Sequence, residues 1–362
     1  MQASVPRVTV LMAVHNGEHF LRPAIESILN QTYRDFELLI VDDASTDNTP
    51  RVIQNYTDPR IKIIHNAKNL GAGIARDIGL QNALGEYVAV LDADDVAYPE
   101  RLEVQSSFLD SHRDIALVGS ACEVIDERGI RLGIRYSVVH HLALRWSLLF
   151  RNPIVHSTVM YRRSLARQVG GYEFRNAEDF ALWSKLASRY PLEQIPKVLA
   201  KYRTYPHQRM CTELDANRTY THLIIRENIK SLLGRDIGTN VVACLNGGSA
   251  SRSVLEEGYM VLCDCLTALI NTEAATRKDR KIIFKALLSD LLRIAHQNEK
   301  HRFFAIWAAV RCAICYTPES LISPECVRFI LQVALPASMR KMAHQWKYLK
   351  KRPAFSGLDP II

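Results

Sequence analysis

In the first 120 residues, short apolar stretches alternate with segments of helical periodicity. Leu21, Ile25 and Ile28 have helical spacing after the first stretch, and Ile74 and Ile78 predict the buried face of a further helix. Each apolar stretch is short enough to be a strand that is buried on both faces. The stretches are residues 8–14, 36–41, 61–64, 87–91 and 115–119. This βαβ alternation predicts an α/β fold with a doubly wound sheet, whose ligands bind beyond the carboxyl ends of the strands.

Two clusters of carboxylates directly follow predicted strands. Asp42 and Asp43 come after FELLIV, and Asp92, Asp94 and Asp95 come after YVAVL. Crowded carboxylates repel one another unless a positive charge compensates, and Mg²⁺ or Mn²⁺ binds one or two carboxylates together with the phosphates of a substrate. Alternatively, the first cluster begins a polar turn and the second caps the helix that follows. Because both clusters should face one crevice, together they favour a metal-bound nucleotide diphosphate.

The two common phosphate-binding loops are absent from the sequence. A dinucleotide-binding fold needs G-x-G-x-x-G after its first strand, but this chain has AVHNG there. Gly71-Ala72-Gly73 is followed by Arg76 instead of a third glycine, and no G-x-x-x-x-G-K-[ST] occurs. A nucleotide must therefore be held in another kind of site.

Four separated signatures together resemble the GT-A-fold glycosyltransferases of family 2, which are inverting enzymes that use a nucleotide-diphosphate sugar. The first signature is VTVLMAVHNGEHFLRPAIESILNQTYRDFELLIVDDASTDNT with NLGAGIARDIGL, and the others are GEYVAVLDADDV, NPIVHSTVMYRRS and GGYEFRNAEDFALWSKL. The resemblance runs from about residue 7 to residue 205. It implies a doubly wound mixed sheet in a GT-A catalytic domain at 1–210, with a nucleotide-sugar-binding half at 1–120 and an acceptor-binding half at 121–210, followed by a helical C-terminal region at 211–362.

On the donor side, the resemblance assigns roles to individual residues. It implies that Asp43 contacts the base, commonly uracil, and that Arg76 contacts the nucleotide or its phosphates. Asp92 is expected to touch the ribose. Asp94 is expected to coordinate the divalent cation, Mn²⁺ or Mg²⁺, that bridges the phosphates, and Asp95 is a second candidate ligand.

The loop after the first strand is also expected to line the donor site. Ala13 stands at a position that is often polar in the family, so a hydroxyl contact to the base is not expected there. His15 and Asn16 are then the expected lining residues of this loop.

On the acceptor side, the resemblance points to Asp179. Transfer with inversion needs a carboxylate that takes the proton from the acceptor hydroxyl as this attacks the anomeric carbon. The resemblance gives that role to Asp179, with His156 and Glu178 as candidates for contacts to acceptor or phosphate. Alternatively, the two acids only open a helix, where they favour the macrodipole, and the histidine makes a structural hydrogen bond.

Beyond about residue 210 the resemblance ends and the pattern is helical, with Ile283, Leu287 and Leu291 on one face. Cys312 and Cys315 have the spacing of a redox or zinc pair, but no second pair stands at ligand spacing, so we expect core cysteines. An acid-free basic tail containing Trp346 and Tyr348 suits the anionic inner face of a membrane, or forms a solvated terminal helix. Its basic residues are Arg340, Lys341, Lys347, Lys350, Lys351 and Arg352.

The sequence shows no targeting or membrane-spanning signal. The apolar stretch near the N-terminus is short and is expected to be the first strand, and Phe303 to Val310, closed by Arg311, is far shorter than a bilayer span. The eight cysteines have no framework spacing. We therefore expect a cytoplasmic protein that contacts the membrane only peripherally.

The sequence thus predicts a metal-dependent, inverting glycosyltransferase of cell-surface polysaccharide synthesis. The expected donor is a UDP-sugar, and the expected acceptor is a hydroxyl of a saccharide or glycolipid. Two alternatives remain. A sugar-nucleotidyltransferase would carry a Gly-rich basic loop where HNGEHF stands. A nucleic-acid-binding protein has only the net charge of +8 in its favour, without recognisable binding motifs, so no nucleic-acid partner is expected.

Overall fold

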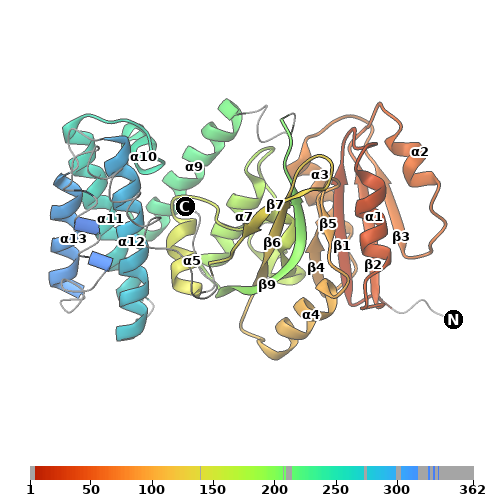
Figure 1. Cartoon of the computed structure of the whole chain (residues 1–362), viewed down its shortest axis with the longest axis horizontal. Helices are drawn as coiled ribbons and strands as arrows, with labels where there is room; N and C mark the ends of the chain where they lie inside the picture. Colours follow the sequence, from red (N-terminus) through yellow and green to blue (C-terminus); the bar gives the residue numbers. More distant parts are fainter. Residues whose placement is uncertain are drawn as a thin grey trace, which may run out of the picture. The chain divides into compact units, whose positions relative to one another are not determined.

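The structure, a computed structural model, describes residues 5–138, 140–206, 208, 214–272, 275–298, 303–316, 325–326, 329–330 and 333. The chain divides into two compact units, Met1–Ile224 and Ile225–Ile362 (Figure 1). The division into a catalytic domain at 1–210 and a C-terminal region at 211–362 concerns function, and it stays a prediction.

The first unit is built on one mixed sheet with nine strands among the described residues. Its parallel half has the order β3-β2-β1-β4, and antiparallel β8 then joins β4 to β6, which is followed by β9 and β5, while β7 pairs with β6. The strands are β1 (Val8–Val14), β2 (Phe36–Asp42), β3 (Ile61–His65), β4 (Tyr87–Val90), β5 (Val96–Ala97), β6 (Leu117–Ile125), β7 (Arg131–Arg135), β8 (Met160–Arg162) and β9 (Leu192–Arg203). The five predicted strands and the mixed α/β sheet are confirmed.

Helices cover both faces of this sheet (Figure 1). Alternate side chains of β1, such as Val10 and Met12, pack in one core with α1 (Leu21–Leu29) and α4 (Arg101–Ser111). The side chain of Leu11 points to the other face, toward α3 (Ala72–Asn82). The remaining helices of this unit are α2 (Thr49–Gln54), α5 (His141–Leu148), η1 (His156–Thr158), α6 (Arg163–Gln168) and α7 (Glu178–Ala187).

The prediction that Ile74 and Ile78 form the buried face of α3 is wrong. Ile74 is 40% exposed and Ile78 is only partly buried, whereas the buried positions include Ala75 and Gly79. A Cβ on Gly79 would lie 2.1 Å from Cδ1 of Leu11. The helix therefore approaches the sheet too closely for isoleucine, and its small residues form the contact.

The second unit contains helices only, among the residues described. Its members are α10 (Thr239–Leu245), α11 (Arg252–Thr272), α12 (Arg277–Gln297) and α13 (Phe303–Tyr316), and α9 (Leu214–Leu233) runs past the boundary between the units. The predicted apolar face of α12 is confirmed, since Ile283, Leu287, Leu291 and Ile294 are all buried. Cys312 is buried, as expected for a core cysteine, but the side chain of Cys315 lies outside the described residues.

Two further expectations concern membranes. No helix in the described ranges is long and apolar enough to cross one. The basic tail from Arg340 to Arg352 lies outside the described residues, so its membrane contact stays a prediction.

Candidate active site

The loops after β1 and β2 are joined by hydrogen bonds at the carboxyl edge of the sheet. Asn16, with a positive φ of 55°, accepts the backbone N–H of Thr46 at 2.8 Å through Oδ1. Nδ1 of His15 lies 2.9 Å from the carbonyl oxygen of Asp43, and Ala13, near the end of β1, is partly buried. His15 and Asn16 are both exposed, so the structure leaves them available to a ligand at this edge.

Asp43 is 2% exposed and holds the loop that leads to α3. Its Oδ1 accepts Nδ2 of Asn66 at 2.8 Å, and its Oδ2 accepts the backbone N–H of Gly71 at 2.8 Å. The backbone N–H of Leu70 is shared between the two oxygens at 3.0 and 3.1 Å. Asp43 therefore shapes the loop, and its predicted contact with a base stays a prediction.

The acidic cluster after β4 is crowded, with Asp95 buried and Asp92 and Asp94 partly buried. Oδ1 of Asp95 accepts the backbone N–H of Arg203 at 2.7 Å, and Oδ2 of Asp94 accepts the Tyr205 hydroxyl at 3.0 Å. Burial and then the charge of Asp92 raise the pKa of Asp94 to about 6. Burial and then the charges of Asp94 and Asp92 raise the pKa of Asp95 well above its ordinary value.

Two buried arginines surround these carboxylates. Arg101, which is fully buried at the start of α4, donates to the carbonyl oxygens of Val90 at 2.8 Å and Val159 at 2.9 Å. Nε of Arg203 donates to the carbonyl oxygen of Asp94 at 2.8 Å, and its guanidinium lies 4.6 Å from the centre of the Phe20 ring. Burial lowers the pKa of Arg101 to about 10, which leaves it charged near neutral pH. Arg101 was not predicted from the sequence. Its only signal there is its position at the start of the helix that follows the acidic cluster.

The acidic cluster fits an open divalent-cation site. Among the described residues, no group of three or more His, Cys, Asp or Glu side chains could hold a metal ion by itself. Oδ2 of Asp95 is buried without a hydrogen-bond partner, and the neighbouring Ser157 hydroxyl lowers the pKa of Asp95. Asp94 and Asp95 could therefore provide two carboxylates for a cation, and its remaining ligands would come from substrate phosphates.

A second network joins α3, the loop after β4, η1 and the start of α7. The Arg76 guanidinium pairs with Oδ1 of Asp92 at 2.6 Å and, through its other terminal nitrogen, with Oε1 of Glu178. Nδ1 of His156 lies 3.8 Å from the same Asp92 oxygen, and its Nε2 lies 3.1 Å from the Tyr172 hydroxyl. Each of these four residues was predicted separately from the sequence as a contact residue, and the structure brings their side chains together. They are Arg76, Asp92, His156 and Glu178. Arg76 faces carboxylates here, so its contact with phosphates stays a prediction.

Asp179 lies in the first turn of α7, next to Glu178. Its Oδ2 accepts Nδ2 of Asn152 at 2.8 Å, and its Oδ1 accepts the backbone N–H of Phe180 at 2.7 Å. Burial and then the charge of Glu178 raise the pKa of Asp179 to about 7. A partly exposed carboxylate of this pKa can exchange a proton with a substrate near neutral pH. Asn152, which orients it, was not selected from the sequence, although it opens the NPIVHSTV segment.

Comparison of the sequence with known proteins points to one family. Residues 9–170 match the model of glycosyl transferase family 2. EpsE of Bacillus subtilis is 38% identical over 187 residues, which is 50% of this chain and 66% of EpsE, so the match spans just under two thirds of that relative. An uncharacterized glycosyltransferase of Haemophilus influenzae is 32% identical over 281 residues, which is 71% of this chain and 87% of the relative.

The fold leads to the same group of proteins. TarS of S. aureus, solved in complex with UDP-GlcNAc, superposes with a TM-score of 0.54 over 84% of this chain and 91% of that structure, at 17% sequence identity. This likeness concerns the fold, which is the GT-A fold. With the match over residues 9–170 and a 32% identical relative covered over 87% of its length, the chain belongs to glycosyl transferase family 2.

Proposed function

We propose that the chain transfers a sugar, with inversion, from a nucleotide-diphosphate sugar to an acceptor hydroxyl, and that Asp179 is the general base. One observation carries this proposal. A carboxylate with a pKa of about 7 is oriented by an amide and stands beside the ion pairs of Arg76 with Asp92 and Glu178. The proton-accepting group is thus next to the charged residues at the end of β4.

Asp179 would take the proton of the acceptor hydroxyl while the oxygen attacks the anomeric carbon from the face opposite the leaving nucleoside diphosphate. Asn152 and the backbone N–H of Phe180 each hold one oxygen of Asp179 in position, and each oxygen keeps a second lone pair that could accept the proton. A single base is sufficient when positive charge stabilises the leaving diphosphate, because no acid is then needed there.

Asp94 and Asp95 would hold the divalent cation, Mg²⁺ or Mn²⁺. When bound, the cation supplies positive charge to the two phosphates of the donor. Tyr205 must then share or release Oδ2 of Asp94, because its hydroxyl occupies that oxygen. Asp43, His15 and Asn16 lie at the same edge of the sheet and would contact the nucleoside, with Ala13 behind them.

The expected donor is a UDP-sugar, and the expected acceptor is a growing saccharide or a glycolipid of the cell surface. Among similar proteins, a Bacillus subtilis protein, 30% identical over 203 residues, is named as a teichuronic acid biosynthesis glycosyltransferase, TuaG. TarS was solved with UDP-GlcNAc. Such names support testing UDP-sugars first. A lipid-linked acceptor would also be served by the proposed peripheral contact between the basic tail and an anionic membrane.

Asp179→Asn tests the proposal. The variant keeps the size and the hydrogen-bonding shape of the side chain but cannot accept the acceptor's proton at neutral pH. We expect turnover to fall by roughly 10²- to 10⁴-fold with nearly unchanged donor affinity. Asp114→Asn, at an exposed position, is the matched control and should retain full turnover. A similar loss of donor affinity in Asp179→Asn would show that Asp179 is structural, and unchanged turnover would exclude it as the base.

A further inference from the structure

Two cysteines from different helices of the second unit lie in direct contact. Sγ of Cys263, on α11, is 2.9 Å from Sγ of Cys312, on α13. The two helices pack against each other, and the Cys263 sulfur also lies 3.9 Å from the carbonyl oxygen of Ala308 on α13. Both cysteines are thiols in the structure, without a disulfide bond. A covalent bond between them needs the sulfurs to approach by only about 0.9 Å, to the usual length of about 2.05 Å.

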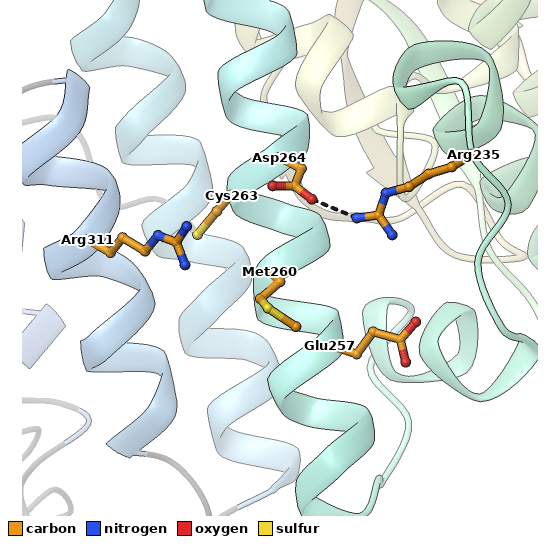
Figure 2. A pocket seen from close by; sticks show the side chains of 6 residues that line it. All are labelled: Arg235, Glu257, Met260, Cys263, Asp264 and Arg311. Atoms are coloured by element: carbon orange, nitrogen blue, oxygen red, sulfur yellow. Dashed lines mark hydrogen bonds and ion pairs between the residues drawn. The ribbon is translucent and has the colours of Figure 1, made fainter.

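One of the two sulfurs lines a pocket at the surface of this unit. Figure 2 shows the pocket, with the Arg311 guanidinium and the Cys263 sulfur pointing toward one another. Arg235 pairs with Asp264 at 2.6 Å on another side of it. The lining residues are Arg235, Glu257, Met260, Cys263, Asp264 and Arg311. Cys263 is 7% exposed and Cys312 is 1% exposed, so a small reagent would reach Cys263 first.

The residues around Cys263 also favour its thiolate form. A hydrogen bond from Cys312 and, less strongly, the charge of Arg311 lower the pKa of the Cys263 thiol in spite of its burial. Two residues along the same helix, burial raises the pKa of the Cys265 thiol. Because the thiolate is the nucleophile, the two cysteines of one helix should differ strongly in reactivity.

We propose that Cys263 and Cys312 form a site of oxidative modification, at which a hydroperoxide converts the two thiols into a disulfide. The Cys263 thiolate attacks one peroxide oxygen, the O–O bond breaks, and hydrogen peroxide yields a sulfenic acid and hydroxide, which takes up the proton released by the thiol. Cys312 then attacks the sulfenic sulfur, the S–S bond forms, and the sulfenic oxygen leaves as water. In sum, two thiols are oxidised by two electrons and one hydrogen peroxide is reduced to two waters.

The bond would join α11 to α13 across 49 residues of chain. Closing a loop of this length reduces the entropy of the unfolded chain. The oxidised second unit should therefore unfold at a higher temperature than the reduced one, by more than about 5 °C. Adding dithiothreitol should return the unfolding temperature to its original value.

The test uses the full chain, fully reduced and then titrated with hydrogen peroxide, with intact mass and peptide mapping after alkylation of the remaining thiols. We expect loss of two hydrogen atoms, reversed by dithiothreitol, and one cross-linked peptide pair containing Cys263 and Cys312. Cys263→Ser and Cys312→Ser should each abolish the cross-link, and Cys265→Ser, the matched control on α11, should leave it unchanged.

Some results would overturn the proposal. Stable addition of oxygen to Cys263 without a cross-link would show that Cys312 cannot resolve the sulfenic acid. A cross-link that forms equally fast between other cysteines, or only after unfolding, would show that the contact between α11 and α13 is not the reactive one. Peptide mapping of the wild-type chain alone distinguishes these results, so the test does not depend on the folding of a variant.

Discussion

Replacing Arg76 by methionine removes the cation between Asp92 and Glu178 and keeps a side chain of moderate length. The Arg76 side chain is 8% exposed, that of Glu178 is 2% exposed and that of Asp92 is 25% exposed. Burial by itself lowers the pKa of Arg76, but the charges of Asp92 and Glu178 outweigh burial and raise it. The wild-type guanidinium is thus charged throughout the accessible pH range, and its loss leaves two carboxylates without their shared counter-ion.

The size of the effect follows from this burial. Removing one partner of a buried ion pair costs about 3–5 kcal/mol, because the other charge stays buried without compensation. Glu178, which is 2% exposed, loses this buried ion pair in the variant, and the more exposed Asp92 adds less. We therefore expect Arg76→Met to lower the free energy of unfolding of the first unit by about 3–5 kcal/mol at pH 7. Adding Glu178→Gln removes the stranded charge, so the double variant should be at least about 1 kcal/mol more stable than the sum of the single effects.

Unfolding in urea is monitored by hydrogen exchange in peptides from α3 and α7. These peptides report on the first unit alone, because the two units need not unfold in one transition. Arg128→Met, in an exposed turn, is the matched control and should change stability by less than about 0.5 kcal/mol. If Arg76→Met destabilises by less than about 1 kcal/mol, or if the two substitutions add without coupling, Arg76 is not the shared counter-ion of this site.

Four other predictions concern Gly73, Asp179 and the basic tail. Gly73→Ala should destabilise the first unit by more than about 2 kcal/mol in urea unfolding, because its Cβ would lie 1.8 Å from the carbonyl oxygen of Phe174, whereas Gly133→Ala, with open space around it, should not. The value of kcat/KM should rise about tenfold per pH unit below pH 7 and level off above it, as Asp179 ionises. Because the pKa of Asp179 is raised, its ionisation destabilises the folded chain as pH rises through about 7. Asp179→Asn should therefore increase thermal stability more at pH 8 than at pH 4. Vesicles of anionic lipid should retain the chain at physiological salt, and a chain ending near residue 335 should bind less; equal binding would exclude the tail as the contact.

The sequence predicted well those features that depend on local periodicity. Five of the nine described strands of the first unit follow from short apolar stretches between helical segments, and each of these five is present within a few residues. The face of α3 was predicted wrongly, because hydrophobic spacing cannot show how closely a helix approaches a sheet. There, Gly79 against Leu11 decides the packing, and Ile74 points outward.

The contacts within the candidate site could not be predicted from the sequence. Arg76 and Glu178 were both marked, yet 102 residues separate them, and no local pattern indicates that they pair. Arg203, whose backbone N–H donates to Asp95 from 108 residues away, was not predicted as a site residue. Buried arginines compensate the crowded carboxylates through tertiary contacts, and the spacing of residues along the chain cannot predict such contacts.

The central claim is that the acidic cluster after β4 holds a metal-bound nucleoside diphosphate. Isothermal calorimetry with UDP, GDP, CDP, ADP and dTDP, with and without Mn²⁺, on the wild type and on Asp94→Ala tests it directly. We predict tight binding of one diphosphate, UDP in first place, that requires Mn²⁺ and is lost in Asp94→Ala. Binding that is equally tight in EDTA or in the variant, or no binding of any diphosphate, would contradict the claim.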